Sequence, residues 1–228
     1  MKPVEALLAA YEAGQRIFGE NYVQELVDKA ANPCLSGLEG LEYHFIGKLQ
    51  SNKVGLLVKN VRQLSMIETI DTTKLAKKVD TSVEAAISEG SRPPGPLRVM
   101  IQVNSSGEPQ KGGVESHDDA VALAKFIVSE CKHLELTGLM TIGRADYTAG
   151  PENFTYLAEC RAVVTNALAQ LGSGEDAAAA ASGEEPPAPA LELSMGMSGD
   201  YPAAIEHGST NVRVGSTIFG ARAPRPPA

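Results

Sequence analysis

The sequence has no tryptophan, few aromatic residues and no cluster of basic residues. Phe, Trp and Tyr make up 5% of the 228 residues, and 28 acidic side chains outnumber 20 Lys and Arg, for a net charge of −8 at pH 7. Nucleic-acid binding needs basic side chains that neutralise phosphates and aromatic rings on which bases stack. The composition therefore argues against nucleic acid as a direct partner and predicts an acidic, soluble protein.

Cysteines and long apolar runs are also scarce. The three cysteines, Cys34, Cys131 and Cys160, form no C-x-x-C pair, and the four histidines have no H-x-H or H-x-x-x-H spacing. Neither a disulfide framework nor a metal site is therefore indicated. No apolar run approaches the roughly 20 residues that cross a membrane, and the chain opens on an amphipathic helical pattern with Glu5 and Glu12 rather than a targeting signal. We expect a cytoplasmic protein without membrane contact.

Short apolar runs alternate with helical patterns along most of the chain. The runs that predict strands span residues 16–21, 43–47, 65–70, 97–104, 136–142, 191–198 and 211–220. Helical patterns lie at residues 22–31, 52–59, 73–89, 118–132, 154–171 and from Pro202 onward. A strand followed each time by a helix predicts right-handed crossovers and a parallel sheet, either doubly wound or closed into a barrel.

The number of predicted strands is one short of a closed barrel. A (β/α)8 TIM barrel has eight strands, whereas the sequence shows seven and opens with a helical pattern at residues 4–14. We therefore expect an α/β fold of the TIM-barrel type whose first strand is missing from this chain, in a single domain of residues 1–222. Residues 172–190 are rich in Gly, Ser, Ala, Glu and Pro and predict a disordered insertion, and residues 223–228 predict a flexible tail.

The ends of the last two predicted strands carry residues suited to an anion. Ser198 lies just before a helix start that contains Pro202, and the next strand contains Arg213, Gly215 and Ser216. Barrels of this type commonly bind phosphate through the loops after strands seven and eight and through helix N-termini, where backbone N–H groups lack partners. Gly215 lets a ligand approach the backbone, Ser216 adds a hydroxyl and Arg213 adds a charge. The alternative is that Ser198 only caps a helix and Gly215 only eases barrel packing.

Six segments carry a specific pattern: FGENYVQE (18–25), HFIGKLQSNK (44–53), QVNSSGEPQKGG (102–113), GLMTI (138–142), LSMGMSGDYPAAIEHGST (193–210) and VRVGSTIFGAR (212–222). Together they resemble the pyridoxal phosphate homeostasis proteins, also called the YggS or PROSC family. The resemblance extends over nearly the whole chain outside residues 172–190. It implies a barrel like the N-terminal domain of alanine racemases, which binds pyridoxal 5′-phosphate (PLP) and has no known catalytic reaction of its own.

Individual residues match the family's PLP site. The resemblance implies that Ser198, Gly215 and Ser216 hold the phosphate, and that Asn21 lines the site from another strand end. It also implies that Arg213 lies beside the cofactor, facing either the phosphate or the ring nitrogen. Lys111 matches a loop lysine that family members often carry.

The lysine that bonds to PLP is the main departure from the family. Family members end their first strand in a Ser-Lys-Thr-Lys-Pro-like segment whose first lysine forms a Schiff base with PLP. This chain begins Met1-Lys2-Pro3, so Lys2 matches the second lysine. The resemblance therefore implies either a fragment of a longer protein or a variant that cannot form the usual covalent adduct. Lys2 and Lys48 are candidates to replace the missing lysine, and we expect neither to do so.

Three functions are compatible with these residues. We favour a non-catalytic PLP-binding protein of intracellular PLP homeostasis, a monomer that exchanges PLP with PLP-dependent apoenzymes. The first alternative is a PLP-dependent, racemase-like enzyme, which needs the Schiff-base lysine, an opposing acid or base and usually a second domain. The second alternative is a truncated barrel that no longer binds PLP covalently.

Overall fold

The computed structural model describes residues 2–108, 111–143, 151–172 and 191–220. In this part of the chain, seven strands form one sheet in the order β1-β2-β3-β4-β5-β6-β7. Each strand pairs in parallel with the next strand along the chain. The strands are β1 (Ile17–Glu20), β2 (Glu42–Phe45), β3 (Leu64–Ile70), β4 (Leu97–Gln102), β5 (Leu134–Met140), β6 (Glu192–Met197) and β7 (Asn211–Arg213).

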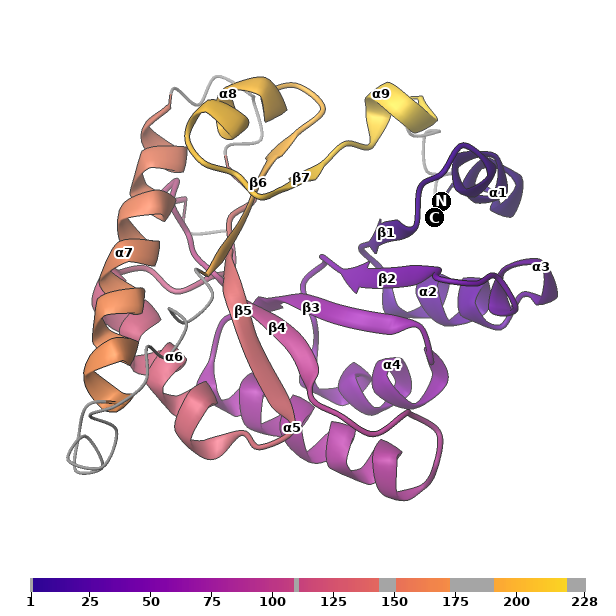
Figure 1. Ribbon diagram of the computed structural model, residues 1–228, viewed down its shortest axis with the longest axis horizontal. Helices are drawn as coiled ribbons and strands as arrows, with labels where there is room; N and C mark the ends of the chain where they lie inside the picture. Colours follow the sequence, from indigo (N-terminus) through magenta and orange to yellow (C-terminus); the bar gives the residue numbers. More distant parts are fainter. Residues whose placement is uncertain (1, 109–110, 144–150, 173–190, 221–228) are drawn as a thin grey trace, which may run out of the picture.

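Helices connect the strands and cover the outer face of the sheet (Figure 1). Among the helices that the structure describes, none combines the length and the apolar character needed to cross a membrane. The helices are α1 (Val4–Glu12), α2 (Val23–Ala30), α3 (Pro33–Ser36), η1 (Ser51–Lys53), α4 (Val54–Asn60), α5 (Thr73–Ser88), α6 (His117–Glu130), α7 (Glu152–Gly172), α8 (Tyr201–Glu206) and α9 (Ser216–Phe219).

The sheet curves so far that it nearly closes into a barrel. Its two edge strands, β1 and β7, lie at either end of this curve, next to α1 and α9 (Figure 1). Within the described residues no backbone pairing joins β1 to β7. The Lys2 ammonium bridges this region instead, because its Nζ donates to the carbonyl oxygens of Phe219 and Gly220, at 2.7 Å each.

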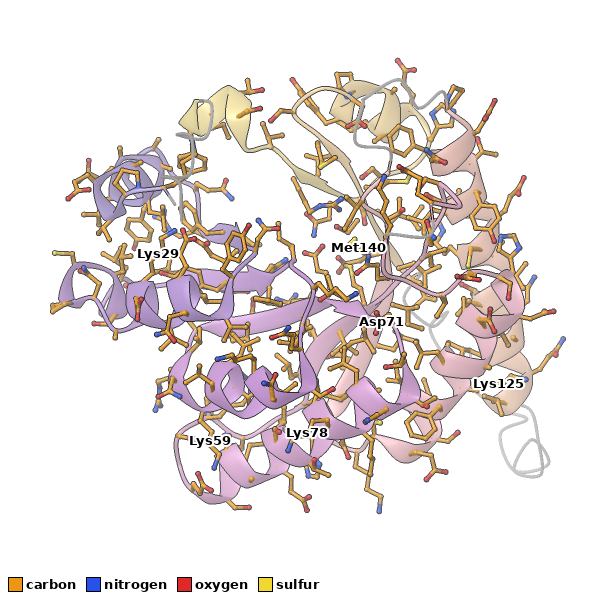
Figure 2. All side chains as sticks on the ribbon, turned by 180° about the vertical axis from the view of Figure 1, so that it is seen from behind. Lys29, Lys59, Asp71, Lys78, Lys125 and Met140 are labelled. Atoms are coloured by element: carbon orange, nitrogen blue, oxygen red, sulfur yellow. The ribbon has the colours of Figure 1, made fainter. Side chains whose placement is uncertain are left out.

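The two faces of the sheet bury different side chains. The main apolar core lies between the sheet and the helices and includes Tyr43, Phe45 and Ile67. A separate small cluster of Met66, Met100 and Met140 is also fully buried. Figure 2 shows Met140 toward the middle of the molecule and Lys59, Lys78 and Lys125 on the helices at its periphery. This division follows from strand geometry, since successive side chains point to opposite faces.

The predicted order of strands and helices is confirmed, with two local errors. The run at 211–220 is a strand only as far as Arg213, because α9 begins at Ser216 and the N–H groups of Ile218 and Phe219 turn back to the Gly215 carbonyl. The short helix α3 was not predicted, although Asn32 caps it by accepting from the Cys34 N–H. The predicted insertion at 172–190 and the predicted tail at 223–228 lie outside the described residues, apart from Gly172 at the end of α7.

A Gly47→Ala substitution tests the close approach of the chain segments that follow β1 and β2. A Cβ atom on Gly47 would lie 2.0 Å from the Asn21 carbonyl oxygen, so the backbone has to move. We expect the free energy of unfolding in urea to fall by about 3 kcal/mol, at the upper end of the usual cost of overpacking. Gly55→Ala in α4 is the control, because its Cβ would have no neighbour within 4 Å. The control should raise stability by up to about 1 kcal/mol, and an equal effect of both substitutions would contradict the contact.

Candidate functional site

The ends of β6 and β7 bring backbone donors and a serine hydroxyl together. Ser198 Oγ accepts hydrogen bonds from the backbone N–H groups of Gly215, at 3.0 Å, and Thr217, at 3.3 Å. Gly196 allows this end of β6 to pack under α8, since it has φ 94° and a Cβ there would lie 2.6 Å from the Ala204 Cβ. The segments that follow β6 and β7 thus place their polar groups close together, at the carboxyl ends of two neighbouring strands.

Ser198 does not cap the helix that follows it. Asp200 is the residue at the N-cap of α8, and its Oδ1 accepts from the Met197 N–H at 2.6 Å. Pro202 lies in the first turn of α8, as the sequence predicts. The Ser198 hydroxyl instead accepts from N–H groups at the start of α9, so the alternative that Ser198 caps a helix is excluded for α8 and stays open for α9.

This arrangement fits a phosphate group. Gly215, Ser216 and Thr217 are exposed, and a Cβ atom on Gly215 would have no neighbour within 4 Å, so there is room above the backbone. A phosphate oxygen could accept the same two N–H groups that now bond to Ser198, while the Ser198 hydroxyl donates to it. Both N–H donors are fixed by the backbone, and the Ser198 hydroxyl would have to release them and turn toward the ligand.

Arg213 comes from β7 and turns into the interior of the barrel. One terminal nitrogen donates to Ser194 Oγ and the other donates to the Thr141 carbonyl oxygen, both at 2.6 Å. Burial lowers the pKa of the Arg213 guanidinium, while the charges of Glu68 and Asp200 oppose this shift. Arg213 therefore reaches from β7 past β6 to the end of β5 and places a positive charge in the interior.

Glu68 supplies the countercharge inside the barrel. This residue is 1% exposed, and its carboxylate accepts from Ser194 Oγ at 2.5 Å, from His44 Nδ1 at 2.7 Å and from Asn211 Nδ2 at 3.3 Å. Burial by itself raises the pKa of Glu68, but the hydrogen bond with His44, the charge of Arg213 and the hydrogen bond from Ser194 together lower it below its ordinary value of 4.5. Glu68 is thus an ionised carboxylate that joins four strands.

His44 completes this group on the β2 side. Since the Glu68 carboxylate accepts, the hydrogen bond assigns the ring proton of His44 to Nδ1. The other ring nitrogen, Nε2, is buried and has no hydrogen-bond partner among the described residues. No site role was predicted from the sequence for His44, Glu68 or Ser194. The signal in the sequence that could have indicated them was a charged residue, Glu68, and a small polar residue, Ser194, within mainly apolar strands.

The remaining predicted residues lie at other strand ends. Asn21 follows β1, the opposite edge strand, and within the described part of the chain its side chain makes no hydrogen bond. Lys111 lies in the loop after β4, where its ammonium contacts the Glu108 carboxylate and the Gly143 carbonyl oxygen. Lys48 is exposed. The structure therefore groups Ser198, Gly215 and Ser216 closely and leaves Asn21 on a different strand.

A curved parallel sheet covered by helices defines a nearly closed barrel of the TIM type, and the backbone N–H groups after β7 are candidate phosphate donors at the carboxyl ends of its strands. The family described as "Alanine racemase, N-terminal domain" matches residues 2–223 of the chain. Within it, the pyridoxal phosphate homeostasis protein of Mus musculus is 44% identical over 225 residues, which cover 97% of this chain and 74% of that protein. The chain belongs to the pyridoxal phosphate homeostasis protein family.

Solved structures agree with this assignment. PipY of Synechococcus elongatus PCC7942, in a structure without PLP, has 32% sequence identity and a TM-score of 0.73, covering 96% of this chain and 88% of PipY. PipY with PLP bound has 30% identity and a TM-score of 0.71 over the same shares of both chains. The resemblance read from the sequence is therefore confirmed.

Replacing Glu68 by Gln tests the buried carboxylate. At pH 7 we expect the free energy of unfolding to fall by on the order of 3 kcal/mol, because Arg213 loses its countercharge. The folded-state pKa of Glu68 is lowered, so its contribution is present above the unfolded value of 4.5 and disappears as the pH falls through the folded value. The two proteins should therefore approach equal stability in acid, where a protonated Glu68 resembles Gln.

Urea unfolding at several pH values between 7 and about 3 measures this difference. Glu84→Gln, at an exposed position of α5, is the matched control and should change stability by less than about 0.5 kcal/mol at every pH. A constant difference between Glu68→Gln and the unmodified chain across this range would show that Glu68 is not the titrating group.

Proposed function

We propose that this chain binds PLP at the carboxyl ends of its strands and acts in intracellular PLP homeostasis without catalysing a reaction of its own. The observation that carries the proposal is the convergence of the Gly215 and Thr217 N–H groups on Ser198, in a chain whose relatives are named for PLP homeostasis. The structure of PipY with PLP bound supports the same ligand. When bound, PLP supplies an aldehyde that reacts reversibly with amines.

Different residues of the chain would contact different parts of the cofactor. Ser198 and the backbone of Gly215 and Ser216 would hold the phosphate, with Asn21 lining the site from β1. The inward course of Arg213 supports a position beside the cofactor ring rather than around the phosphate, because both of its terminal nitrogens already donate to Ser194 and Thr141. Glu68 would keep that guanidinium charged and in place.

The proposed cellular role rests on the relatives, which are named for PLP homeostasis. We propose a cytoplasmic monomer, formed by a single barrel domain of residues 1–222, that receives PLP and passes it to PLP-dependent apoenzymes. The barrel relatives include enzymes such as alanine racemase, so activity is the point to test directly. Absence of alanine racemisation by the PLP-loaded chain is the expected result, and turnover at enzyme-like rates would overturn the non-catalytic assignment.

Two substitutions test which residue contacts the phosphate group and which contacts the rest of the cofactor. Ser198→Ala should weaken both PLP and inorganic phosphate by about 1 kcal/mol, since each loses one hydrogen bond. Arg213→Ala should weaken PLP by about 1–3 kcal/mol and leave inorganic phosphate almost unchanged, because the guanidinium lies beside the ring. Isothermal titration calorimetry measures both ligands, and Arg161→Gln on α7 is the control for general charge loss. If Arg213→Ala bound PLP as tightly as the unmodified chain, the assignment of Arg213 would be wrong.

Borohydride reduction tests whether a lysine of this chain bonds to PLP. The amine nitrogens of Lys2 and Lys111 are already engaged, since Lys2 donates to the Phe219 and Gly220 carbonyls and Lys111 contacts Glu108. Lys48 is exposed. We expect residues 1–228 to bind PLP reversibly, with no stoichiometric product at one lysine. Peptide mass spectrometry after reduction measures this. Stoichiometric labelling of Lys2 or Lys48 would contradict the prediction and identify the attachment site.

A further inference from the structure

A groove lies at the end of the barrel where the strands begin. It has a volume of about 410 Å³ and lies between the starts of β2, β3, β4 and β5 and the loop that joins α5 to β4. Because all seven strands run in parallel, this end is opposite the Ser198 site. Leu41, Leu64, Pro93 and Pro96 form an apolar part of its lining, and three arginines form a charged part. We call it the basal groove.

Arg92, in the lining of the basal groove, is a buried cation that has no countercharge among the described residues. The residue is 8% exposed, and one terminal nitrogen donates to the Leu64 carbonyl oxygen at 2.9 Å. Its Nε is buried with no hydrogen-bond partner, and no carboxylate of the described residues forms an ion pair with it. Burial lowers the pKa of this guanidinium, because the charge has lost its hydration. A buried charge with unused donors is costly unless an anion accompanies it.

The local sequence holds Arg92 firmly in this position. Gly90, with φ 73°, ends α5, and the N–H groups of Ser91 and Arg92 both turn back to the Ala86 carbonyl, at 3.0 and 3.1 Å. Pro93 and Pro94 follow directly, so the backbone on the other side of Arg92 is also restricted. A cation that is fixed before its ligand arrives loses little entropy on binding.

Two further arginines make the groove positive in an otherwise acidic protein. Arg62 is exposed, and Arg98 is half-buried and pairs with Glu42 at 3.0 Å. Glu42 and Glu135 are the acidic residues of the lining, so three guanidiniums face two carboxylates, whereas the chain as a whole carries a net charge of −8. Arginine binds carboxylates and phosphates through paired N–H groups, which makes such a cluster a recognition surface for either anion.

A purely structural role explains only part of this arrangement. The hydrogen bond from Arg92 to Leu64 would brace the start of β3, but it uses one donor and requires no net charge. It also leaves the buried Nε and the excess of arginine unexplained. The second terminal nitrogen of Arg92 is not buried and has no hydrogen-bond partner among the described residues, so an anion in the groove could accept from it. The apolar lining would contact the rest of that ligand.

We propose that the basal groove binds a small organic anion, a phosphate or a carboxylate on an apolar body, with Arg92 as its principal anion-binding residue. The site is independent of the PLP site and of the function proposed above. Phenyl phosphate and benzoate are suitable probes, because they share a ring and differ in the anion. Benzyl alcohol is the uncharged control.

Amide chemical shifts of the 228-residue chain distinguish the two sites in one titration. Phenyl phosphate, benzoate or both should shift the signals of Leu64, Ser65 and Ser91 saturably, with dissociation constants up to about 10 mM. Signals of Gly215 and Thr217 report separately on phosphate binding at the other end. Saturation by one anion alone identifies the ligand class. No saturable shift at the groove with either anion, or an equal response to benzyl alcohol, would overturn the proposal.

Substitutions then identify the anion-binding residue. Arg92→Gln should weaken the probe that binds by about tenfold or more, the effect of losing a charge-assisted hydrogen bond. Because Arg92 is buried and its loss could disturb folding, Arg62→Gln provides a second test at an exposed position of the same lining and should weaken binding several-fold at unchanged stability. Arg161→Gln on α7, outside the groove, is the matched control. Unchanged affinity in both groove variants would contradict the proposal.

Discussion

The interior of this barrel depends on one buried carboxylate. Glu68 on β3 accepts hydrogen bonds from His44 on β2, Ser194 on β6 and Asn211 on β7, and it lies in the field of Arg213. These strands are not all neighbours in the sheet, so the carboxylate connects its two halves across the interior. A buried charge without hydrogen-bond partners is strongly destabilising. The folded state therefore needs His44, Ser194 and Asn211 in positions where they bond to Glu68. The negative charge of Glu68 also explains why the Arg213 side chain points into the barrel.

The sequence predicts the sheet much better than it predicts this interior. Alternating apolar runs and helical patterns locate all seven strands because both signals are local. The last strand was extended too far, because the apolar and β-branched residues of 214–219 fit a strand pattern until the Gly215 turn intervenes. Ser198, Gly215 and Ser216 could be predicted because strand ends have a known role in barrels. The hydrogen bonds from Gly215 and Thr217 to Ser198, and the bond between Ser194 and Glu68, depend on how far the sheet curves. No local sequence pattern predicts that curvature.

The two ends of the barrel handle positive charge in different ways. At the carboxyl ends of the strands, Arg213 is neutralised from below by Glu68, and uncharged N–H groups of Gly215 and Thr217 provide the exposed donors. At the opposite end, Arg92 is buried with only a carbonyl partner among the described residues. Hydrogen bonds to backbone carbonyl oxygens thus orient both guanidiniums. Because the chain has a net charge of −8, these two arginines are local positive sites in an acidic protein.

The sequential order of the strands shapes the route by which the chain folds. Each strand pairs with its neighbour in sequence, so the sheet can grow through contacts of moderate separation, each with a modest loop-closure cost. The bonds of Glu68 to Ser194 and Asn211 join residues 126 and 143 positions apart and link β3 to β6 and β7, so they form after the intervening strands β4 and β5 have been placed. The polar interior is therefore a late product of folding. It is also the part that a partial opening of the β6–β7 edge would release first, taking Ser198 and its donors with it.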